Sequence, residues 1–332
     1  MNVGLTGCGQ LALHVHLPLL RRLGVKVSAL ADPNPEALQQ AGQRVPGARL
    51  CGSLKQLLEG FDGQAGLVTS PPFTHAQAAV SILAAGHSVY LEKPLAHSLE
   101  DGQRIQRAAQ DARGLLMVGF NLRFHPLLIE LGQRFRSGEI GELVLLRSAF
   151  HLAPGPQPEW RLDPERGGGP MFELATHHLD LWETISGRRL ERLSCQTSGV
   201  SLALQGQLEG GALVQGSFSL ASAEEEVVEL FGDRGRLRVR RYASGEVEFA
   251  PLEARGERLR QLQAWLRLPS QWRYWREKFT SPWQEPSYAR SLEAFFQSLR
   301  QGRLVAGAAD VSAGMRNLEW LLQPELLLNA GP

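Results

Sequence analysis

Short apolar runs alternate with helix-like segments over the first 120 residues. The runs at 2–6, 25–31, 65–69, 87–91 and 115–119 have the length of buried strands, and the segments between them have helical character. Strands that alternate with helices favour a parallel sheet with right-handed crossovers. The pattern therefore predicts an N-terminal α/β domain over residues 1–120, with a doubly wound parallel sheet.

The alternation of predicted strands and helices ends after residue 121. Apolar runs now follow one another with short glycine-containing turns, at 143–152, 190–198, 202–208, 212–220, 225–231 and 235–241. Consecutive strands with short turns favour a large, mostly antiparallel sheet. Helices are expected at 170–186, 256–279, 287–301 and 310–322, and the Pro- and Gly-rich stretch 153–169 reads as a long loop. Residues 121–332 are thus expected to form an α+β domain.

Composition narrows the function classes. The 332 residues include 35 basic and 34 acidic side chains, so the net charge of +1 gives no general field for nucleic acid or an anionic membrane. The chain shows no signal-like leader and no apolar run of membrane-spanning length, which favours a cytoplasmic protein with a small-molecule partner. The three cysteines are widely spaced and odd in number, which argues against a disulfide framework or a CxxC metal site.

A dinucleotide fingerprint follows the first predicted strand. It is a GxGxxA sequence in which glycines allow a tight turn and close approach of a pyrophosphate, and a small residue lets the helix pack on the strand. The alternative is a turn that binds no phosphate. The candidate cofactor-binding residues here are Gly7, Cys8, Gly9, Gln10, Leu11 and Ala12.

Two later strand ends add to this site. Asp32 ends the second strand, where a carboxylate binds ribose hydroxyls and repels a 2′-phosphate, so NAD is favoured over NADP as the cofactor. Ser70, Pro71 and His75 follow the third strand and are expected on the nicotinamide side, although a plain turn is the competing interpretation.

Lys93 is the first candidate for proton chemistry. Only four basic residues are lysines, namely Lys26, Lys55, Lys93 and Lys278, and an ammonium can lose its proton where a guanidinium cannot. Lys93 stands in Glu92-Lys93-Pro94 at the end of a predicted strand, where open α/β sheets place their chemistry. Glu92 and Lys93 are therefore included among the cofactor contacts, against the alternative of a solvated surface lysine.

A second set of polar residues lies on the helix predicted at 170–186. Glu173, His177 and Asp180 stand at i, i+4 and i+7, and in an α-helix this spacing places them on one face. An imidazole between two carboxylates suits a general acid or base. The competing interpretations are a solvated helix face and a metal site; the absence of HExxH spacing argues against metal.

Taken in order, these motifs resemble the glucose-fructose oxidoreductase, inositol dehydrogenase and MocA family of nicotinamide-dependent oxidoreductases. The similarity runs from Gly7-Cys8-Gly9 through Asp32, residues 70–75, Glu92-Lys93-Pro94 and residues 119–124 to residues 167–180. It implies an N-terminal Rossmann domain, a C-terminal α+β domain, and homodimers or homotetramers built on the open face of the antiparallel sheet. Many members carry Asp where this chain has Glu173, which puts a borrowed role at that position in doubt.

The resemblance implies that Lys93 and His177 line the site where a carbinol meets the nicotinamide. His177 would take the hydroxyl proton, and Lys93 would hydrogen-bond the developing alkoxide and assist the proton relay. Glu173 and Asp180 would orient His177 or hold substrate hydroxyls. Asn121, Arg123 and Trp160 are candidate substrate contacts, along with Glu173 and His177. For Arg123, a structural ion pair is an equal alternative.

The expected activity is hydride transfer between the nicotinamide and a secondary alcohol or carbonyl of a sugar, polyol or related compound. An NAD-dependent glycosidase that oxidises its substrate transiently, and a non-catalytic NAD- or sugar-binding regulator, are the alternatives. The basic, tryptophan-rich segment 255–283 is unassigned. It fits a subunit-interface or lid helix, with an anionic ligand or a membrane surface as competing interpretations.

Overall fold

The computed structural model describes residues 1–156, 158–241, 245–252 and 285–326. The chain divides into two compact units. The first is made of Met1–Asn121, Glu159–Gly168 and Ser287–Leu322, and the second of Leu122–Pro158, Gly169–Pro286 and Gln323–Pro332. Each unit is therefore built from several segments of the chain. The single boundary predicted after residue 120 does not include these later segments. The helix expected at 256–279 and the segment 255–283 lie outside the described residues.

The first unit contains a six-stranded parallel sheet with the order β3-β2-β1-β4-β5-β6. The order reverses between β1 and β4, which is the switch point of a Rossmann fold. The five predicted strands are confirmed, and β3 is the one that hydrophobic pattern did not reveal, because only one of its three residues is buried. The strands are β1 (Asn2–Thr6), β2 (Lys26–Ala31), β3 (Arg49–Cys51), β4 (Ala65–Val68), β5 (Ser88–Glu92) and β6 (Leu116–Gly119).

The crossover helices of this unit begin at recognisable caps. Asn34 accepts hydrogen bonds from two backbone N–H groups at the start of α2, and Ser53 and Ser98 each accept one at α3 and α5. The helices are α1 (Leu17–Arg22), α2 (Pro35–Arg44), α3 (Leu54–Leu58), α4 (His75–Ala84) and α5 (Leu99–Asp111).

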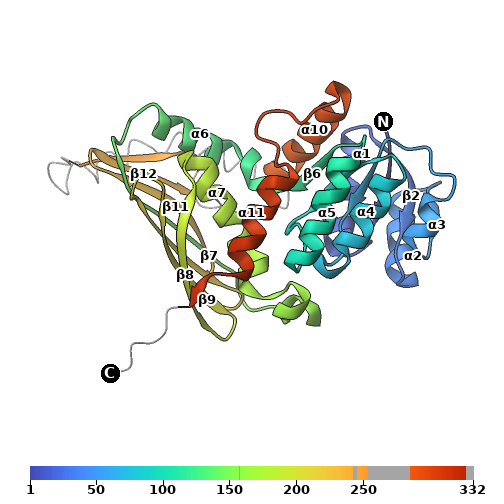
Figure 1. Cartoon of the computed structure of the whole chain (residues 1–332), viewed down its shortest axis with the longest axis horizontal. Coiled ribbons are helices and arrows are strands. Elements are labelled where there is room, and N and C mark those ends of the chain that lie inside the picture. The colour runs from blue at the N-terminus through green and yellow to red at the C-terminus, as the bar shows by residue number, and fades with distance from the viewer. Residues whose placement is uncertain (157, 242–244, 253–284, 327–332) are drawn as a thin grey trace. The chain divides into compact units, whose positions relative to one another are not determined.

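Two C-terminal helices return to the first unit, as predicted for 287–301 and 310–322. They are α10 (Pro286–Gln301) and α11 (Val311–Leu322), and α11 lies along α5 (Figure 1). A Cβ at Gly102 of α5 would lie 2.6 Å from Leu318 and 2.8 Å from the Met315 sulfur. Glycine at this position therefore permits the close approach of the two helices.

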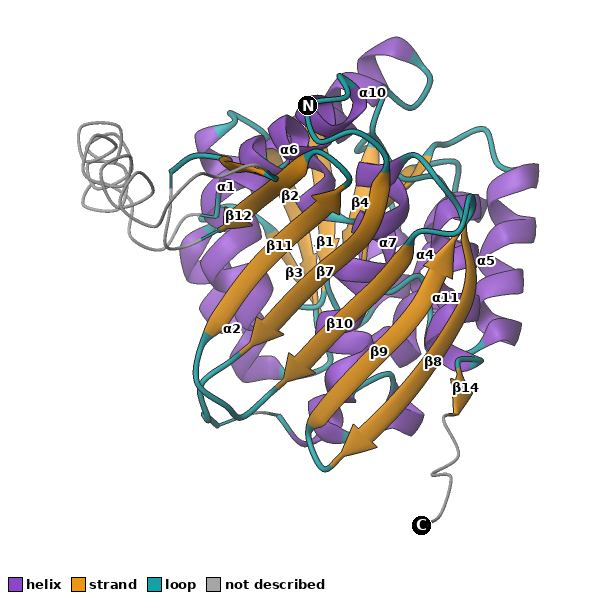
Figure 2. Ribbon diagram, turned by 90° about the vertical axis from the view of Figure 1, so that its left-hand side faces the viewer, coloured by secondary structure: helices purple, strands orange, loops and turns teal. Residues whose placement is uncertain are grey.

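The second unit contains an eight-stranded sheet with the order β13-β12-β11-β7-β10-β9-β8-β14 (Figure 2). Most neighbours are antiparallel, as predicted, whereas β7 with β10 and β8 with β14 are parallel. The short strands β13 and β14 and the helix α6 (Pro126–Arg136) were not predicted. The strands are β7 (Leu143–His151), β8 (Leu190–Ser198), β9 (Ser201–Leu208), β10 (Leu213–Ser219), β11 (Glu225–Gly232), β12 (Gly235–Arg240), β13 (Glu248–Pro251) and β14 (Glu325–Leu326).

One face of this sheet carries helices α6 and α7 (Thr176–Ser186), and Figure 2 shows the opposite, open face. Buried Trp182 of α7 donates a hydrogen bond to Ser148 of β7 at 2.9 Å, which seats the helix on the strands. The open face is the one on which the resemblance places subunit contacts, and the homodimer or homotetramer stays a prediction. In the part of the chain that the structure describes, no helix has the length and apolarity needed to cross a membrane.

Candidate active site

The fingerprint turn requires glycine at its two positions for different reasons. Gly7 has φ +90°, and a Cβ there would lie 2.3 Å from the backbone nitrogen of Ser70, so the protein itself excludes any side chain. A Cβ at Gly9 would meet no atom of the described residues within 4 Å. Packing within the described residues therefore does not explain glycine at position 9, and close approach of a cofactor there stays a prediction. Ala12 is fully buried, as expected for helix–strand packing.

Asp32 lies against this turn. Its carboxylate accepts hydrogen bonds from the backbone N–H of Cys8 at 2.7 Å and of Asn34 at 2.8 Å. Two backbone donors leave further acceptor sites on the two oxygens, which suits the ribose hydroxyls of a dinucleotide. Burial raises the pKa of the Cys8 thiol to about 12, with a further contribution from Asp32, so Cys8 stays protonated and contributes its backbone rather than thiolate chemistry.

The turn after β4 lies beside the fingerprint. Thr69 donates a side-chain hydrogen bond to the Gly7 carbonyl at 2.6 Å, and the hydroxyls of Ser70 and Thr74 are 2.6 Å apart. The ring of His75 is fully buried, with Nδ1 2.8 Å from the Pro94 carbonyl and Nε2 2.9 Å from the Ser70 carbonyl. Both nitrogens thus face the protein, so His75 supports the turn, and direct contact of Ser70, Pro71 or His75 with a cofactor stays a prediction.

Glu92 and Lys93 close β5 at the carboxyl edge of the sheet, as the sequence predicted. Glu92 is buried, and its carboxylate accepts a hydrogen bond from Nε2 of His16 at 2.8 Å. The sequence analysis missed His16, because a histidine inside the apolar stretch 11–20 has no spacing that marks it. It is the last residue of a π-helix, Ala12–His16, which begins at the last residue of the fingerprint.

The second candidate set lies in the second unit and begins with a correction. A helix is present over the range predicted at 170–186, but residues 171–175 form a π-helix before α7 starts at Thr176, so the α-helical spacing assumed for Glu173 is wrong. A π-helix has a different rotation per residue, and the i, i+4 argument that linked Glu173 with His177 does not hold there. His177 and Asp180 share α7 at i, i+3, and all three side chains are buried.

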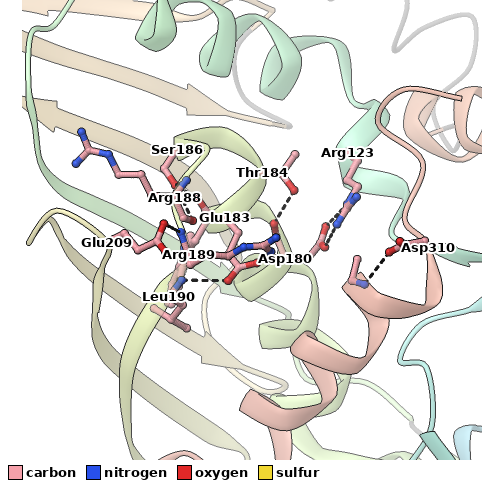
Figure 3. A network of polar contacts seen from close by, with 12 residues as sticks. Arg123, Asp180, Glu183, Thr184, Ser186, Arg188, Arg189, Leu190, Glu209 and Asp310 are labelled. Atoms are coloured by element: carbon pink, nitrogen blue, oxygen red, sulfur yellow. Dashed lines mark hydrogen bonds and ion pairs between the residues drawn. The ribbon is translucent and has the colours of Figure 1, made fainter. Parts of the chain in front are cut away.

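Asp180 forms a two-pronged ion pair with Arg123. The guanidinium donates from Nε at 2.7 Å and from Nη2 at 2.5 Å to the two carboxylate oxygens (Figure 3). Asp180 is 5% exposed and Arg123 14%, so water screens the pair weakly. The alternative of a structural ion pair for Arg123 is thus observed, with both partners in the second unit. Contact of Arg123 with a substrate stays a prediction.

The structure separates the roles of the two adjacent histidines of α7. His178 lies between the rings of Phe150 and Phe218, with centroid distances of 5.8 and 5.0 Å, and neither ring nitrogen has a hydrogen-bond partner in the described residues. Burial lowers the pKa of His178 to about 3, and the charge of Arg241 contributes. His178 is therefore a neutral packing residue, which leaves His177 as the candidate for proton transfer.

This packing predicts an acid-sensitive fold. Between pH 6.5 and about 3 the unfolded chain binds a proton at His178 that the folded chain does not, so stability falls as pH decreases. Relative to the variant His178→Leu, the wild type is expected to lose about 2 kcal/mol more unfolding free energy between pH 7.5 and 5. Urea denaturation at both pH values measures this, with exposed His14→Leu as a control. Equal losses in wild type and His178→Leu would contradict the assignment.

The remaining candidates fall in different surroundings. Asn121 is buried and donates a hydrogen bond to Ser287 at 2.7 Å. Trp160 lies in the short 3-10 helix Glu159–Leu162, which belongs to the first unit. The segment Glu159–Gly168, which contains this helix, packs near the turn after β4. Arg166 stacks on the Phe73 ring at 4.5 Å, and a Cβ at Gly167 would lie 2.8 Å from Pro72. Substrate contacts by Asn121 and Trp160 stay predictions.

Groups of three or more His, Cys, Asp or Glu side chains able to hold a metal ion do not occur in the described ranges. The expectation of a metal-free reaction remains a prediction. What the described residues do provide is a Gly-rich turn with an oriented carboxylate in the first unit, and a buried His and Glu in the second.

Comparison with protein families agrees with this arrangement. The model of the GFO/IDH/MocA oxidoreductase family with an NAD-binding Rossmann fold matches residues 1–120, and the model of the GFO/IDH/MocA C-terminal domain matches residues 129–238. The chain belongs to this family. It is thus a member of a family of NAD(P)-dependent dehydrogenases and reductases, as the motifs predicted.

Individual relatives are more distant. The chain is 29% identical over 251 residues to dTDP-3,4-didehydro-2,6-dideoxy-alpha-D-glucose 3-reductase of Saccharopolyspora spinosa, covering 73% of this chain and 75% of the relative. It is 32% identical over 181 residues to inositol 2-dehydrogenase of Gluconacetobacter diazotrophicus, covering 53% of each. The chain spans about half the length of several curated relatives it matches.

Solved structures share the fold over nearly the whole chain. The WlbA dehydrogenase from Bordetella pertussis, determined with NADH and UDP-GlcNAcA, superposes with a TM-score of 0.79 at 22% identity, covering 97% of this chain and 94% of that one. At this identity the likeness establishes the fold: a Rossmann unit followed by a mostly antiparallel C-terminal sheet.

Proposed function

We propose that this protein is an NAD-dependent dehydrogenase or reductase that transfers hydride between the nicotinamide and a secondary alcohol or carbonyl of a sugar, polyol or sugar nucleotide. The observation that carries the proposal is the fingerprint turn with Asp32 hydrogen-bonded to Cys8 at its centre, in a chain of this oxidoreductase family. The substrate class rests on the relatives, which include an inositol dehydrogenase and a deoxysugar-nucleotide reductase.

The residues of the first unit fit a nicotinamide dinucleotide. The backbone at Gly9 is open to close approach, and the Asp32 carboxylate is held in place by two backbone donors. Gly7 to Ala12 would hold the pyrophosphate, Asp32 the adenosine ribose, and the turn after β4 the nicotinamide side. When bound, the nicotinamide supplies the hydride acceptor or donor, and the chain supplies position and proton handling.

The proton steps are assigned to two side chains. His177 takes the proton of the substrate hydroxyl during oxidation and returns it during reduction. Lys93 hydrogen-bonds the same oxygen, stabilises the negative charge that develops on it and assists the proton relay. Glu173, buried in the π-helix before α7, holds His177 or a neighbouring substrate hydroxyl, and Asp180 fixes Arg123.

Cofactor preference gives a first test. Asp32→Ala is expected to weaken NAD binding by about 10- to 100-fold, because a charge-assisted hydrogen bond contributes about 1.5–3 kcal/mol, and to weaken NADP binding less or not at all. Fluorescence titration with both cofactors measures the ratio. The matched control is Glu36→Gln, an exposed acidic residue of the following helix, which should keep the wild-type ratio. Tighter binding of NADP than NAD by the wild type would remove the role given to Asp32.

Substrate class is tested by a panel of polyols, inositols, free sugars and nucleotide sugars, monitored for NADH at neutral and alkaline pH. We expect NADH formation with at least one of these compounds, and a rate lower by about 10²- to 10⁴-fold in the Lys93→Ala and His177→Ala variants. Cofactor binding without turnover on any compound, in either direction, would favour a non-catalytic binding protein instead.

A further inference from the structure

The chain on either side of Lys93 is attached to two buried histidines of the first unit. Glu92, the residue before Lys93, receives a hydrogen bond from His16 at 2.8 Å. The carbonyl of Pro94, the residue after it, lies 2.8 Å from Nδ1 of His75. The three-residue segment that carries the candidate proton donor is thus bound at both ends by imidazole rings.

His16 is buried among aromatic rings, and its hydrogen bond goes to Glu92. Its ring is fully buried and packs edge-on against Tyr90 and Tyr288, with centroid distances of 5.8 and 6.0 Å. Nδ1 has no hydrogen-bond partner in the described residues, so Nε2 to Glu92 is its one hydrogen bond there. Burying an imidazole nitrogen without a hydrogen-bond partner costs free energy, and packing alone does not explain a histidine at this position.

The Glu92 carboxylate links His16 to the backbone of Lys93. The carboxylate is 3% exposed, and a buried carboxylate is tolerated only when it is paired and hydrogen-bonded. One oxygen accepts from His16 and the other from the backbone N–H of Lys93 at 3.3 Å. The same side chain therefore connects the end of the fingerprint helix to the backbone of Lys93.

His75 makes the matching connection from the other cofactor turn. Its two nitrogens face the Ser70 and Pro94 carbonyls, which end or follow the neighbouring strands β4 and β5. Burial lowers the pKa of His75, against the opposing influence of the two carbonyls and of Glu92. A neutral ring donates to one of the two carbonyls at a time, so His75 is hydrogen-bonded to one turn and contacts the other through the same buried ring.

We propose that His16 and His75 are positioning residues that set the location of Lys93 and couple it to the two turns that hold the cofactor. His16 ends the π-helix that starts in the fingerprint, and His75 opens α4 directly after residues 70–74. A bound cofactor that fixes the positions of these two turns would therefore also fix the position of Lys93, through Glu92 on one side and Pro94 on the other. The inference rests on the proposed function of Lys93 in proton handling, and it adds two residues that need touch neither substrate nor cofactor.

The kinetic consequence is a loss in kcat rather than in cofactor binding. His16→Leu and His75→Leu are each expected to lower kcat by about 10- to 100-fold, because a misplacement of about 1 Å costs this much. The dissociation constant for NAD should change by less than about threefold. His16→Gln and His75→Asn retain a donor near the original nitrogen and are expected to recover most of the rate. His14→Leu, on the exposed side of the same π-helix, is the control.

A second readout does not depend on turnover. The chain has four lysines, so reductive methylation with ¹³C-formaldehyde gives four lysine signals by NMR, and Lys93→Arg identifies the one of interest. Saturation with NAD is expected to shift the Lys93 signal in the wild type, His16→Gln and His75→Asn. In the two leucine variants that shift should be lost while fluorescence still reports bound NAD. A wild-type shift in both leucine variants would overturn the proposal, even if no substrate had been found.

Discussion

Replacing Lys93 or His177 with alanine is expected to lower kcat/KM for the substrate by about 10²- to 10⁴-fold, the range for loss of a positioned acid–base group. The loss should appear mainly in kcat, since neither residue belongs to the fingerprint that holds the pyrophosphate. Steady-state kinetics with saturating NAD measures it. If the two side chains serve one proton transfer, the double variant should be little worse than the poorer single variant.

The controls for this experiment come from the same chain. Lys55→Ala removes an exposed lysine of α3, and His178→Leu removes the neutral histidine next to His177. Lys93→Arg keeps a positive charge but cannot release a proton, so it should recover little activity. Near-wild-type turnover by Lys93→Arg would show that charge alone is required, and near-wild-type turnover by His177→Ala would remove the proton acceptor from the account.

Replacing Arg123 with methionine is expected to lower the unfolding free energy by about 3–5 kcal/mol, because it leaves the Asp180 carboxylate buried without its two-pronged partner. Urea denaturation monitored by tryptophan fluorescence measures the change. The double variant Arg123→Met/Asp180→Leu should recover much of the loss, since a buried ion pair and a well-packed apolar pair have similar stability.

A surface ion pair supplies the matched comparison. Arg104 and Asp101 are 2.7 Å apart, with Arg104 47% exposed, and Arg104→Met should cost less than about 1 kcal/mol. A loss below about 1 kcal/mol for Arg123→Met as well would mean that the buried pair does not stabilise α7, and the substrate-contact alternative for Arg123 would gain weight.

The cofactor half of the site follows closely from local sequence. The fingerprint, Asp32 and the Glu92-Lys93-Pro94 segment each stand at a strand end, and parallel strands bring their carboxyl ends to one edge of the sheet. The apolar runs therefore predicted that these strand ends share one edge of the sheet. The sequence did not indicate His16, because its partner Glu92 lies 76 residues away and no spacing pattern links the two residues.

The reaction half follows less closely. Spacing arguments assume 3.6 residues per turn, and the π-helix at Met171–Ala175 breaks that assumption at Glu173. The partner of Asp180, Arg123, stands 57 residues away in the 3-10 helix Asn121–Phe124, and its pairing is a tertiary event. Sequence spacing grouped Glu173, His177 and Asp180 but could not assign each carboxylate its partner.

Glu173 is the position where the family resemblance is least informative. The resemblance implies aspartate at this position, and the glutamate of this chain is buried in the π-helix Met171–Ala175. Comparison of Glu173→Asp with Glu173→Gln, each beside the wild type, separates the length of the side chain from its charge.

Net hydride transfer is measured most directly with a substrate from the panel that carries deuterium on the carbinol carbon. We expect one NADH per molecule of ketone formed, with the deuterium in the NADH. Product that forms without accumulation of NADH, as in a glycosidase that restores its cofactor each turnover, would contradict it.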